Sequence, residues 1–405
     1  METKNNSHHK QATLKTVFLA LITLFLLIPL TMVQNVIKER GETKTRVTEQ
    51  VMSSYSQPQL IYTPELKSIK TDSIQSIIIN DSQRYPTKLD IEANVTTNTL
   101  HRSVYDVIVY NTNVKISGTF PVTEQSLEAT ENVISLDITD FKGLATLPTM
   151  TYGGKEFKFE RKGNGISTHF VQPQDAQVDD QIPFSFTLDL KGTDSLMFNP
   201  LGVETKLTVN STYKHPSFQG DILPESRDIR NDGFTATWNL SSHNLDDFDY
   251  ITGVKFVEPA NPYQQSTRSA KYGILIIVLV FAAAFFVEFF TQKEISLIQY
   301  TVIGLSLVLF YSLLLSFSEF VAFGIAYTIS LVMTLGALLF YFRAILKSKT
   351  AYWLVAFVAL VYVVNFMVLQ METYALLAGS LVLFVLLCGV MYLTANINNR
   401  TIETE

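Results

Sequence analysis

Residues 268–290 read RSAKYGILIIVLVFAAAFFVEFF, and here a long polar sequence gives way to an apolar one. About twenty consecutive apolar residues are enough to span a bilayer as a helix. Before this stretch, residues 38–267 are mostly polar, and residues 16–33 before them are apolar. Four more apolar stretches follow it, at 298–317, 321–342, 352–369 and 374–394. The pattern predicts about six transmembrane helices, with a folded domain inserted between the first and the second.

This pattern divides the chain into five parts. We expect a tail over 1–15, a first transmembrane helix over 16–37, an inserted domain over 38–271, a five-helix bundle over 272–394 and a second tail over 395–405. A cleaved signal peptide is the alternative for the first helix. The apolar run is long and no small-x-small cleavage site follows it, which favours an uncleaved anchor.

Charge separates the inserted domain from the rest of the 405 residues. Residues 38–270 hold 22 Lys and Arg against 30 Asp and Glu, a net charge of 22 − 30 = −8, and the remainder holds 9 against 7, a net of +2. A net-negative domain argues against nucleic acid as a partner, because phosphate binding needs a basic surface. The single cysteine, Cys388, lies in an apolar run, so the domain has no disulfide.

Basic residues in the short loops predict the orientation of the helices. If the N-terminus is cytoplasmic, the inner segments carry basic residues that include Lys15, Lys293 and Arg343. The two short outer loops then carry no basic residue, and their only charged residues are glutamates. The basic cluster at 38–46 would then lie outside, but long domains are translocated largely regardless of charge. We expect both termini in the cytoplasm and the inserted domain outside the cytoplasmic membrane, in the periplasm.

The inserted domain changes its hydrophobic period along the chain. Val47, Val51 and Tyr55 recur every four residues, which predicts a helical stalk over 38–56. Residues 58–260 then show short runs of alternating polar and apolar residues, for example 184–190 and 234–238, with glycine-rich turns between them. Many short strands without helical patterns predict an all-β, extracytoplasmic domain of the β-sandwich type.

Several motifs give the chain a specific resemblance. The domain contains LDLKG at 188–192, FNPLG at 198–202, HPSFQG at 215–220 and GFTATW at 233–238. The apolar regions contain IPL at 28–30, VIKER at 36–40, RSAKY at 268–272, FFVE at 285–288, SFSE at 316–319 and ETYALLAGS at 372–380. In combination these stretches resemble the CreD family of bacterial inner-membrane proteins, also called cell envelope integrity proteins.

The resemblance implies a role in the envelope, in proteins associated with a two-component regulatory system and, in some bacteria, with the response to β-lactams. It implies no reaction and no catalytic residues. The chain departs from the family at Tyr213, where members tend to have Trp, and at Phe320, where they tend to have His. A role for that histidine therefore cannot be carried over to this chain.

Three glutamates near the membrane are the first candidates for function: Glu288, Glu319 and Glu372. A charge in the hydrocarbon core costs at least about 2.5–3.5 kcal/mol, so ionisable groups there are usually functional. These glutamates fall near predicted helix ends, which favours an ordinary interfacial position over a proton or ligand site. We expect the two outer ones to pair with Arg268 and Lys271, where the domain returns to the membrane.

Other candidates are polar residues within spans and a short motif in the domain. Asn365 is the most central polar residue, and hydrogen bonding between helices is its favoured role. His215 and Ser217 lie in a motif that we expect to be a rigid loop, with a functional site there as the minority reading. No metal-ligand spacing, phosphate-binding loop or nucleophile elbow occurs, and no cofactor is implied.

We therefore predict a non-enzymatic membrane protein that maintains or senses the state of the envelope. Its partners are the lipid bilayer and an envelope component or partner protein bound by the domain. The alternative is a transporter of a small amphiphile, with the domain as receiver. Five or six helices without a visible inverted repeat are few for a monomeric transporter. A membrane-embedded enzyme is the least supported class.

Overall fold

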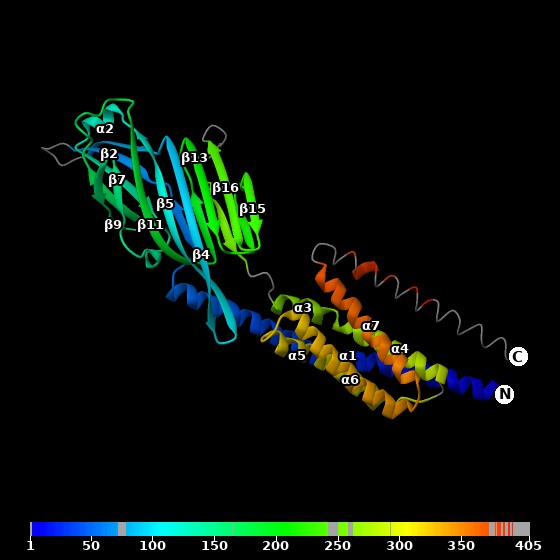
Figure 1. The fold of residues 1–405 in the computed structure, drawn as a ribbon. Helices are drawn as coiled ribbons and strands as arrows, with labels where there is room; N and C mark the ends of the chain where they lie inside the picture. The colour runs from blue at the N-terminus through cyan, green and yellow to red at the C-terminus, as the bar shows by residue number, and fades with distance from the viewer. Residues whose placement is uncertain are drawn as a thin grey trace. The chain divides into compact units, whose positions relative to one another are not determined.

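The computed structural model describes residues 2–71, 78–163, 165–241, 250–257, 262–291 and 293–371, together with single positions up to Met391. The chain divides into two compact units. The helical unit comprises residues 1–43 and 260–405, and the β unit comprises residues 44–259. Figure 1 shows the helices and strands of both units along the chain.

The helical unit contains α1 and a series of helices after the β unit. These are α3 (Pro262–Lys271), α4 (Gly273–Thr291), α5 (Leu297–Ser318), α6 (Phe323–Leu346) and α7 (Thr350–Gln370). Among the described residues, four helices are long and apolar enough to cross a membrane, namely α1, α5, α6 and α7. The pair α3–α4 bends by 42° and makes a fifth if it counts as one span. The sixth expected span, 374–394, lies mostly outside the described residues, so six spans stays a prediction.

Helix α1 runs from Glu2 to Ser54 without a break. The apolar stretch and the stalk that follows it are therefore one helix, and Pro29 lies inside it. Proline is tolerated within membrane helices because neighbouring groups satisfy the freed backbone. Residues up to Thr43 belong to the helical unit, and the last turns belong to the β unit.

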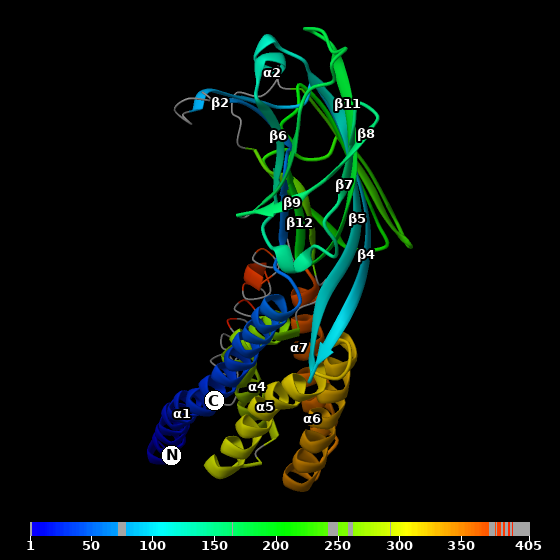
Figure 2. The same cartoon turned by 90° about the vertical axis from the view of Figure 1, so that its left-hand side faces the viewer.

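The β unit contains three sheets. The largest has eight strands in the order β15-β16-β13-β4-β5-β11-β7-β8, a second has five in the order β3-β2-β6-β10-β9, and a third has four in the order β1-β12-β17-β14. Two strand pairs are parallel, β1 with β12 and β4 with β13. Figure 2 shows the length of β4 and β5, which form one hairpin.

The strand bounds follow the chain order. They are β1 (Gln59–Tyr62), β2 (Glu65–Thr71), β3 (Ile78–Arg84), β4 (Lys88–Arg102), β5 (Tyr105–Pro121), β6 (Glu131–Asp137), β7 (Thr149–Tyr152), β8 (Lys155–Lys158), β9 (Glu160–Lys162), β10 (Gly165–Phe170), β11 (Gln181–Thr193), β12 (Ser195–Asn199), β13 (Glu204–Ser211), β14 (Pro216–Gly220), β15 (Ser226–Arg230), β16 (Gly233–Ser241) and β17 (Thr252–Phe256). Two short helical turns, α2 (Glu124–Glu128) and η1 (Phe141–Gly143), interrupt the strands.

One hydrophobic core joins the three sheets. Its buried side chains include Trp238 from the large sheet, Leu136 from the five-stranded sheet and Phe198 from the four-stranded sheet. Alternation along each strand sends one set of side chains into this core, as in β11, where every second residue is buried. The all-β class is confirmed for this region, and the sandwich form stays a prediction.

The structure differs from expectation in two details of the β unit. The strands are not all short, because β4 has 15 residues and β5 has 17. The β unit ends at Pro259, close to the expected end of the β-rich part at residue 260, whereas the whole inserted domain was expected to reach residue 271. Residues Pro262–Lys271 form α3, which buries Tyr263, Ser266 and Ser269 within the helical unit. The polar character of this segment had suggested a part of the domain, but its apolar and small residues recur at helical spacing.

Candidate functional site

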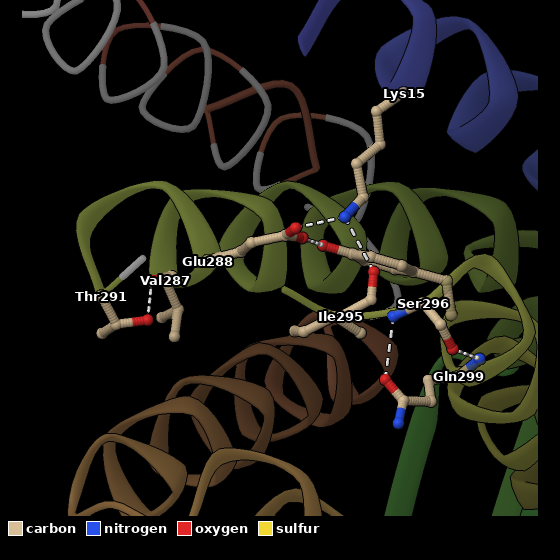
Figure 3. Close-up of polar contacts among 8 residues, drawn as sticks. Lys15, Val287, Glu288, Thr291, Ile295, Ser296 and Gln299 are labelled. Carbon is tan, nitrogen blue, oxygen red and sulfur yellow. Dashed lines mark hydrogen bonds and ion pairs between the residues drawn. The ribbon is translucent and has the colours of Figure 1, made fainter. Parts of the chain in front are cut away.

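A charged cluster lies between α1, α4 and α5 in the helical unit (Figure 3). The ammonium of Lys15 donates to the carboxylate of Glu288 and, at 2.8 Å, to the carbonyl oxygen of Ile295. The hydroxyl of Tyr300 donates to the other Glu288 oxygen at 3.0 Å. The Glu288 side chain is 12% exposed and that of Lys15 is 24% exposed. The Lys15 ammonium and the Tyr300 hydroxyl therefore stabilise the charge of the largely buried Glu288 carboxylate.

A hollow of about 470 Å³ borders this cluster. Lys15, Phe18, Glu294 and Gln299 contribute to its lining. At its edge α5 begins with a capping box, in which Ser296 accepts from the Gln299 N–H and the Gln299 side chain accepts from the Ser296 N–H. The hollow mixes both charge signs with apolar side chains, which suits a membrane interface.

A second charged contact lies farther along α1. The Arg40 guanidinium is 3.8 Å from the Glu319 carboxylate, and the Tyr263 hydroxyl donates to the same carboxylate at 3.3 Å. Glu319 is 12% exposed. We expected Glu319 to pair with Arg268 or Lys271, and that expectation is wrong. Both basic residues are in the last turn of α3, whereas Tyr263, in its first turn, reaches the carboxylate.

The two contacts bracket the apolar part of α1. Arg40 follows Lys15 by 40 − 15 = 25 residues on one helix, which corresponds to roughly 37 Å at about 1.5 Å per residue. A hydrocarbon core is about 30 Å thick. Each end of the apolar stretch is therefore held by an ion pair to another helix of the same unit. Such charges are inexpensive at an interface, and the interfacial position of Glu288 and Glu319 stays a prediction.

A third group of polar side chains is buried among α3, α5, α6 and α7. Asn365 donates to the Tyr327 hydroxyl at 3.1 Å and to the Ser269 hydroxyl at 3.4 Å. Tyr327 in turn donates to the carbonyl oxygen of Tyr362 at 2.8 Å. Phe310 packs on both tyrosine rings, with centroids 5.2 Å and 4.4 Å away. Asn365 thus links three helices, as expected for a polar residue in a span.

Two hydroxyl groups near the bend between α3 and α4 lack hydrogen-bond partners among the described residues. They belong to Ser266 on α3 and Tyr311 on α5, and both atoms are buried. The Tyr311 ring also lies against Gly273, the first residue of α4. Buried polar groups without partners are uncommon in native proteins and invite a functional explanation.

The end of α1 is held inside the β unit by packing and hydrogen bonds. Val51 packs on Val107 and Val109 of β5, and the Tyr55 hydroxyl donates to the Asn111 side chain at 3.1 Å. The last turn of the helix is held as well, because Lys142 donates to the Ser53 carbonyl oxygen at 2.9 Å. The stalk is therefore a packed element of the β unit.

Asp140 organises the chain directly after α1. Its carboxylate accepts from the Gln57 N–H at 2.9 Å, from the Ser56 hydroxyl at 3.2 Å and from the Lys142 N–H at 3.0 Å. Partial burial opposes ionisation, but these hydrogen bonds and the Lys142 charge hold the pKa of Asp140 below its ordinary value. Ionised Asp140 therefore fixes the exit from α1 into β1.

The remaining predicted site residues do not form a catalytic arrangement in the described part of the chain. Ser217 lies on strand β14, not in a loop, and pairs with Lys255 of β17 in the sheet register. His215, just before it, is exposed and packs edge-on against Tyr213. No group of three His, Cys, Asp or Glu residues within the described ranges could hold a metal ion. Glu372 lies outside the described residues.

Sequence reasoning missed Lys15, Arg40, Tyr263 and Tyr300 as partners of the glutamates. The available signal was their position on α1, since Lys15 lies directly before the apolar stretch 16–33 and Arg40 lies in the basic cluster at 38–46 that follows it. They were read only as topology determinants. Their pairing partners are far away in the sequence, 273 residues for Lys15 and Glu288.

Comparison with known proteins identifies relatives across the whole chain. The model of a family described as "Inner membrane protein CreD" matches residues 11–400. The inner membrane protein CreD of Escherichia coli (strain K12) is 29% identical over 413 residues, which cover 93% of this chain and 91% of that protein.

Solved structures give only distant alignments. An M1 zinc metallopeptidase from Deinococcus radiodurans aligns with a TM-score of 0.22 and 10% identity over 42% of each chain. A two-domain M1 zinc metallopeptidase mutant bound to L-arginine aligns with a TM-score of 0.22 and 9% identity, over 46% of this chain and 53% of that chain. Alignments at this level carry no argument about fold or activity.

Proposed function

The chain belongs to the CreD family of inner membrane proteins, and from that premise we propose that it maintains or senses the state of the cell envelope without catalysing a reaction. In this proposal the β unit binds an envelope component or a partner protein. The helical unit anchors that binding in the membrane and relays it. The N- and C-termini are cytoplasmic and the β unit is periplasmic, because the basic residues of the short loops then lie inside.

The observation that carries the proposal is the continuity of α1. The helix is fixed in the helical unit by Lys15 and Arg40, through their glutamate partners. It is fixed in the β unit by Val51 and Tyr55. A helix without a break between two such attachments transmits a displacement or a rotation better than a flexible linker does, because each helical residue has fixed backbone angles.

A truncated chain tests whether the helical unit is needed. The variant ends after residue 259, so that it keeps α1 as an anchor and the β unit on its original helix. We expect it not to restore envelope-stress resistance to a deletion strain at a protein level equal to that of the full chain. Protease resistance of the β unit in membranes controls for its folding. Full restoration by this variant would eliminate the relay.

In vivo crosslinking tests the binding half of the proposal. Photoreactive residues at exposed positions of the β unit, for example Glu92 and Gln177, would capture what the unit contacts in the envelope. The proposal expects a specific adduct from at least one surface of the β unit. If crosslinked adducts form only from photoreactive residues in the helical unit, the β unit has no binding role.

Transport is the second candidate, and the bend between α3 and α4 favours it. Interrupted helices with polar groups at the break commonly form substrate sites in transporters. Here Ser266 and Tyr311 supply buried hydroxyls that have no hydrogen-bond partner in the described part of the chain, and Asn365 lies beside Ser269 on α3. Transport of a small amphiphile predicts that Asn365→Leu abolishes function while Asn365→Gln retains part of it. Full function of the Asn365→Leu variant at an equal protein level would contradict a transport role.

A further inference from the structure

The outward face of the eight-stranded sheet carries an ordered array of polar side chains. Alternate residues of five neighbouring strands, β16, β13, β4, β5 and β11, point away from the core. In register they form three rows across the sheet: Asn239, Lys206, Asp90, Ser117 and Ser185; then Thr237, Thr208, Glu92, Lys115 and Thr187; then Thr235, Asn210, Asn94, Asn113 and Asp189. We call these fifteen residues the polar face.

None of these side chains is buried, and all are polar. Ten of the fifteen are short and uncharged, with amide or hydroxyl groups. With strands about 4.8 Å apart, the five strands span roughly 19 Å. The residues between them along each strand, such as Leu207, Ile91 and Ile116, are buried in the core. The array is therefore backed by a packed core and rich in hydrogen-bonding groups.

Hydrogen bonds within the third row hold its amides in place. Thr235 donates to the Asn210 oxygen at 3.0 Å, and the Asn210 amide donates to the Asn94 oxygen at 3.1 Å. At the other end of the row, the Asn113 amide donates to Asp189 at 2.6 Å. A carboxamide has two donor hydrogens and an oxygen with two lone pairs. Each of these side chains therefore keeps hydrogen-bonding capacity for a ligand, in an orientation that is already fixed.

The charges on the polar face nearly cancel. It carries Lys206 and Lys115 against Asp90, Glu92 and Asp189, a net charge of 2 − 3 = −1. Lys206 lies beside Asp90, and Lys115 lies beside Glu92, in the strand register. A hollow of about 540 Å³ opens along the first row, where Asp90, Ser117, Lys206 and Asn239 line it together with Gly118.

This chemistry excludes several classes of partner. Nucleic acid needs a strongly basic surface, and binding at a lipid surface needs apolar side chains with basic ones beside them. Protein interfaces are enriched in aromatic residues, methionine and arginine, and the polar face has none of these residues. An uncharged polymer with regularly spaced hydroxyl and amide groups complements it best.

We propose that the polar face binds an N-acetylated glycan, a polysaccharide strand whose hydroxyl and acetamido groups pair with the amide and hydroxyl rows. This inference rests on the proposed function, because it names the class of envelope component that the β unit binds. The breadth of the array favours an extended strand over a single sugar, because the hydrogen-bonding groups are spread over five strands. The hollow at the first row receives one sugar or its substituent.

Co-sedimentation of the full-length protein in detergent tests the proposal. The probes are insoluble chitin, which is N-acetylated, purified cell-wall sacculi, and cellulose, which has no acetamido groups. We expect retention on chitin and on sacculi, and at least about tenfold weaker retention on cellulose. Absence of retention on both N-acetylated probes would overturn the proposal, and equal retention on cellulose would overturn the acetamido specificity.

Variants connect the binding to the polar face. Asn94→Ala with Asn113→Ala removes two amides of the third row, and we expect affinity for chitin to fall about tenfold, since two hydrogen bonds are lost. The matched control, Gln125→Ala with Gln177→Ala, removes two exposed amides elsewhere on the β unit and should bind normally. Thr208→Glu, which adds a charge in the middle row of the polar face, beside Glu92, and removes no amide, should weaken binding as well.

Equal retention of the wild type and both polar-face variants would place any glycan binding elsewhere and overturn the assignment. Thermal unfolding of each variant establishes that the β unit is folded. A failure of glycan binding can be distinguished from a failure of the relay through α1. A chain that fails to bind glycan but still needs an unbroken α1 keeps the relay with another partner. If the chain binds glycan and still functions with a broken α1, the glycan proposal is supported and the relay is contradicted.

Discussion

Lys15 near the start of α1 and Glu288 near the end of α4 form an ion pair across 273 residues of sequence. Tyr300 donates to the same carboxylate, so the pair has a hydroxyl on its second oxygen. The contact fixes one end of the apolar part of α1, and Arg40 with Glu319 fixes the other. The account of a relaying helix depends on these two attachments.

Removing one partner of the Lys15–Glu288 pair should destabilise the helical unit. Lys15→Met or Glu288→Gln leaves a largely buried polar group without its partner, which costs about 1–3 kcal/mol. The double variant should cost less than the sum of the two single variants, because neither charge is then left alone. Thermal unfolding in detergent measures all three, and Glu294→Gln, at an exposed neighbour, is the control that should change little. Strictly additive effects would show that the two side chains do not interact.

The outer attachment depends on two partners of Glu319. Tyr263→Phe removes a hydrogen bond to the carboxylate and should cost about 0.5–1.5 kcal/mol. Arg40→Leu should cost about 0.2–1 kcal/mol, because the Arg40 side chain is half exposed and solvent screens its charge. Together they should cost more than the sum, because Glu319 is then largely buried without either partner. Lys38→Leu is the control for lost charge, since Lys38 contacts only exposed Glu42 on its own helix in the described residues. Thermal unfolding of the four variants measures these costs. An Arg40→Leu protein that is as stable as the Lys38→Leu protein would show that Arg40 does not hold Glu319.

Acid should weaken the exit from α1 through Asp140. Its pKa is lower in the folded protein than the ordinary aspartate value of about 3.9. A carboxyl group with a depressed folded pKa contributes stability that is present above the unfolded pKa and lost as the pH falls through the folded pKa. The stability of the β unit should therefore decline below about pH 4. Asp140→Asn should lower the melting temperature at pH 7 and flatten this decline. A variant with an unchanged pH profile would refute the role of the carboxylate.

The sequence predicted the parts of the fold that depend on local periodicity. The alternation at 184–190 corresponds to β11, and the alternation at 234–238 corresponds to β16. Five of the six apolar stretches correspond to described helices. The four-residue spacing of Val47, Val51 and Tyr55 corresponds to the last turns of α1 and the residue that follows them. The spacing of apolar residues within a single segment is enough to show which face of that segment is buried. The family resemblance, drawn from motifs spread over the chain, is confirmed by the match over residues 11–400.

Contacts between distant segments were beyond the sequence patterns. The four-stranded sheet joins β1 to β12 in parallel, and no local pattern states which strand is the neighbour. The motif at 215–220 is predicted to be a rigid loop, but its residues Pro216–Gly220 form strand β14. Proline is accepted at the first residue of an edge strand, and β14 is such a strand. The glutamate partners were missed for the same reason, since Tyr263 and Arg40 are brought to Glu319 only by the packing of three helices.

The polar face was also missed, because its members lie on five strands and only the register places them in rows. Each strand by itself shows ordinary polar residues at alternate positions. The parallel pairing of β4 with β13 brings Asn94 beside Asn210, and the pairing of β4 with β5 brings Asn94 opposite Asn113. The array is thus a property of the topology and not of any one segment.

If α1 transmits a change between the β unit and the helical unit, a break in its helical backbone should abolish the function of the protein. One variant carries Thr43→Gly, Lys44→Gly and Thr45→Gly, and its matched control carries alanine at the same three positions. Both lose the same side chains, but glycine disfavours the helix by about 1 kcal/mol per residue relative to alanine. The measurement is restored envelope-stress resistance of a deletion strain at equal protein level and equal thermal stability of the β unit. The account predicts that the alanine variant restores resistance and the glycine variant does not. Equal restoration by both would contradict it.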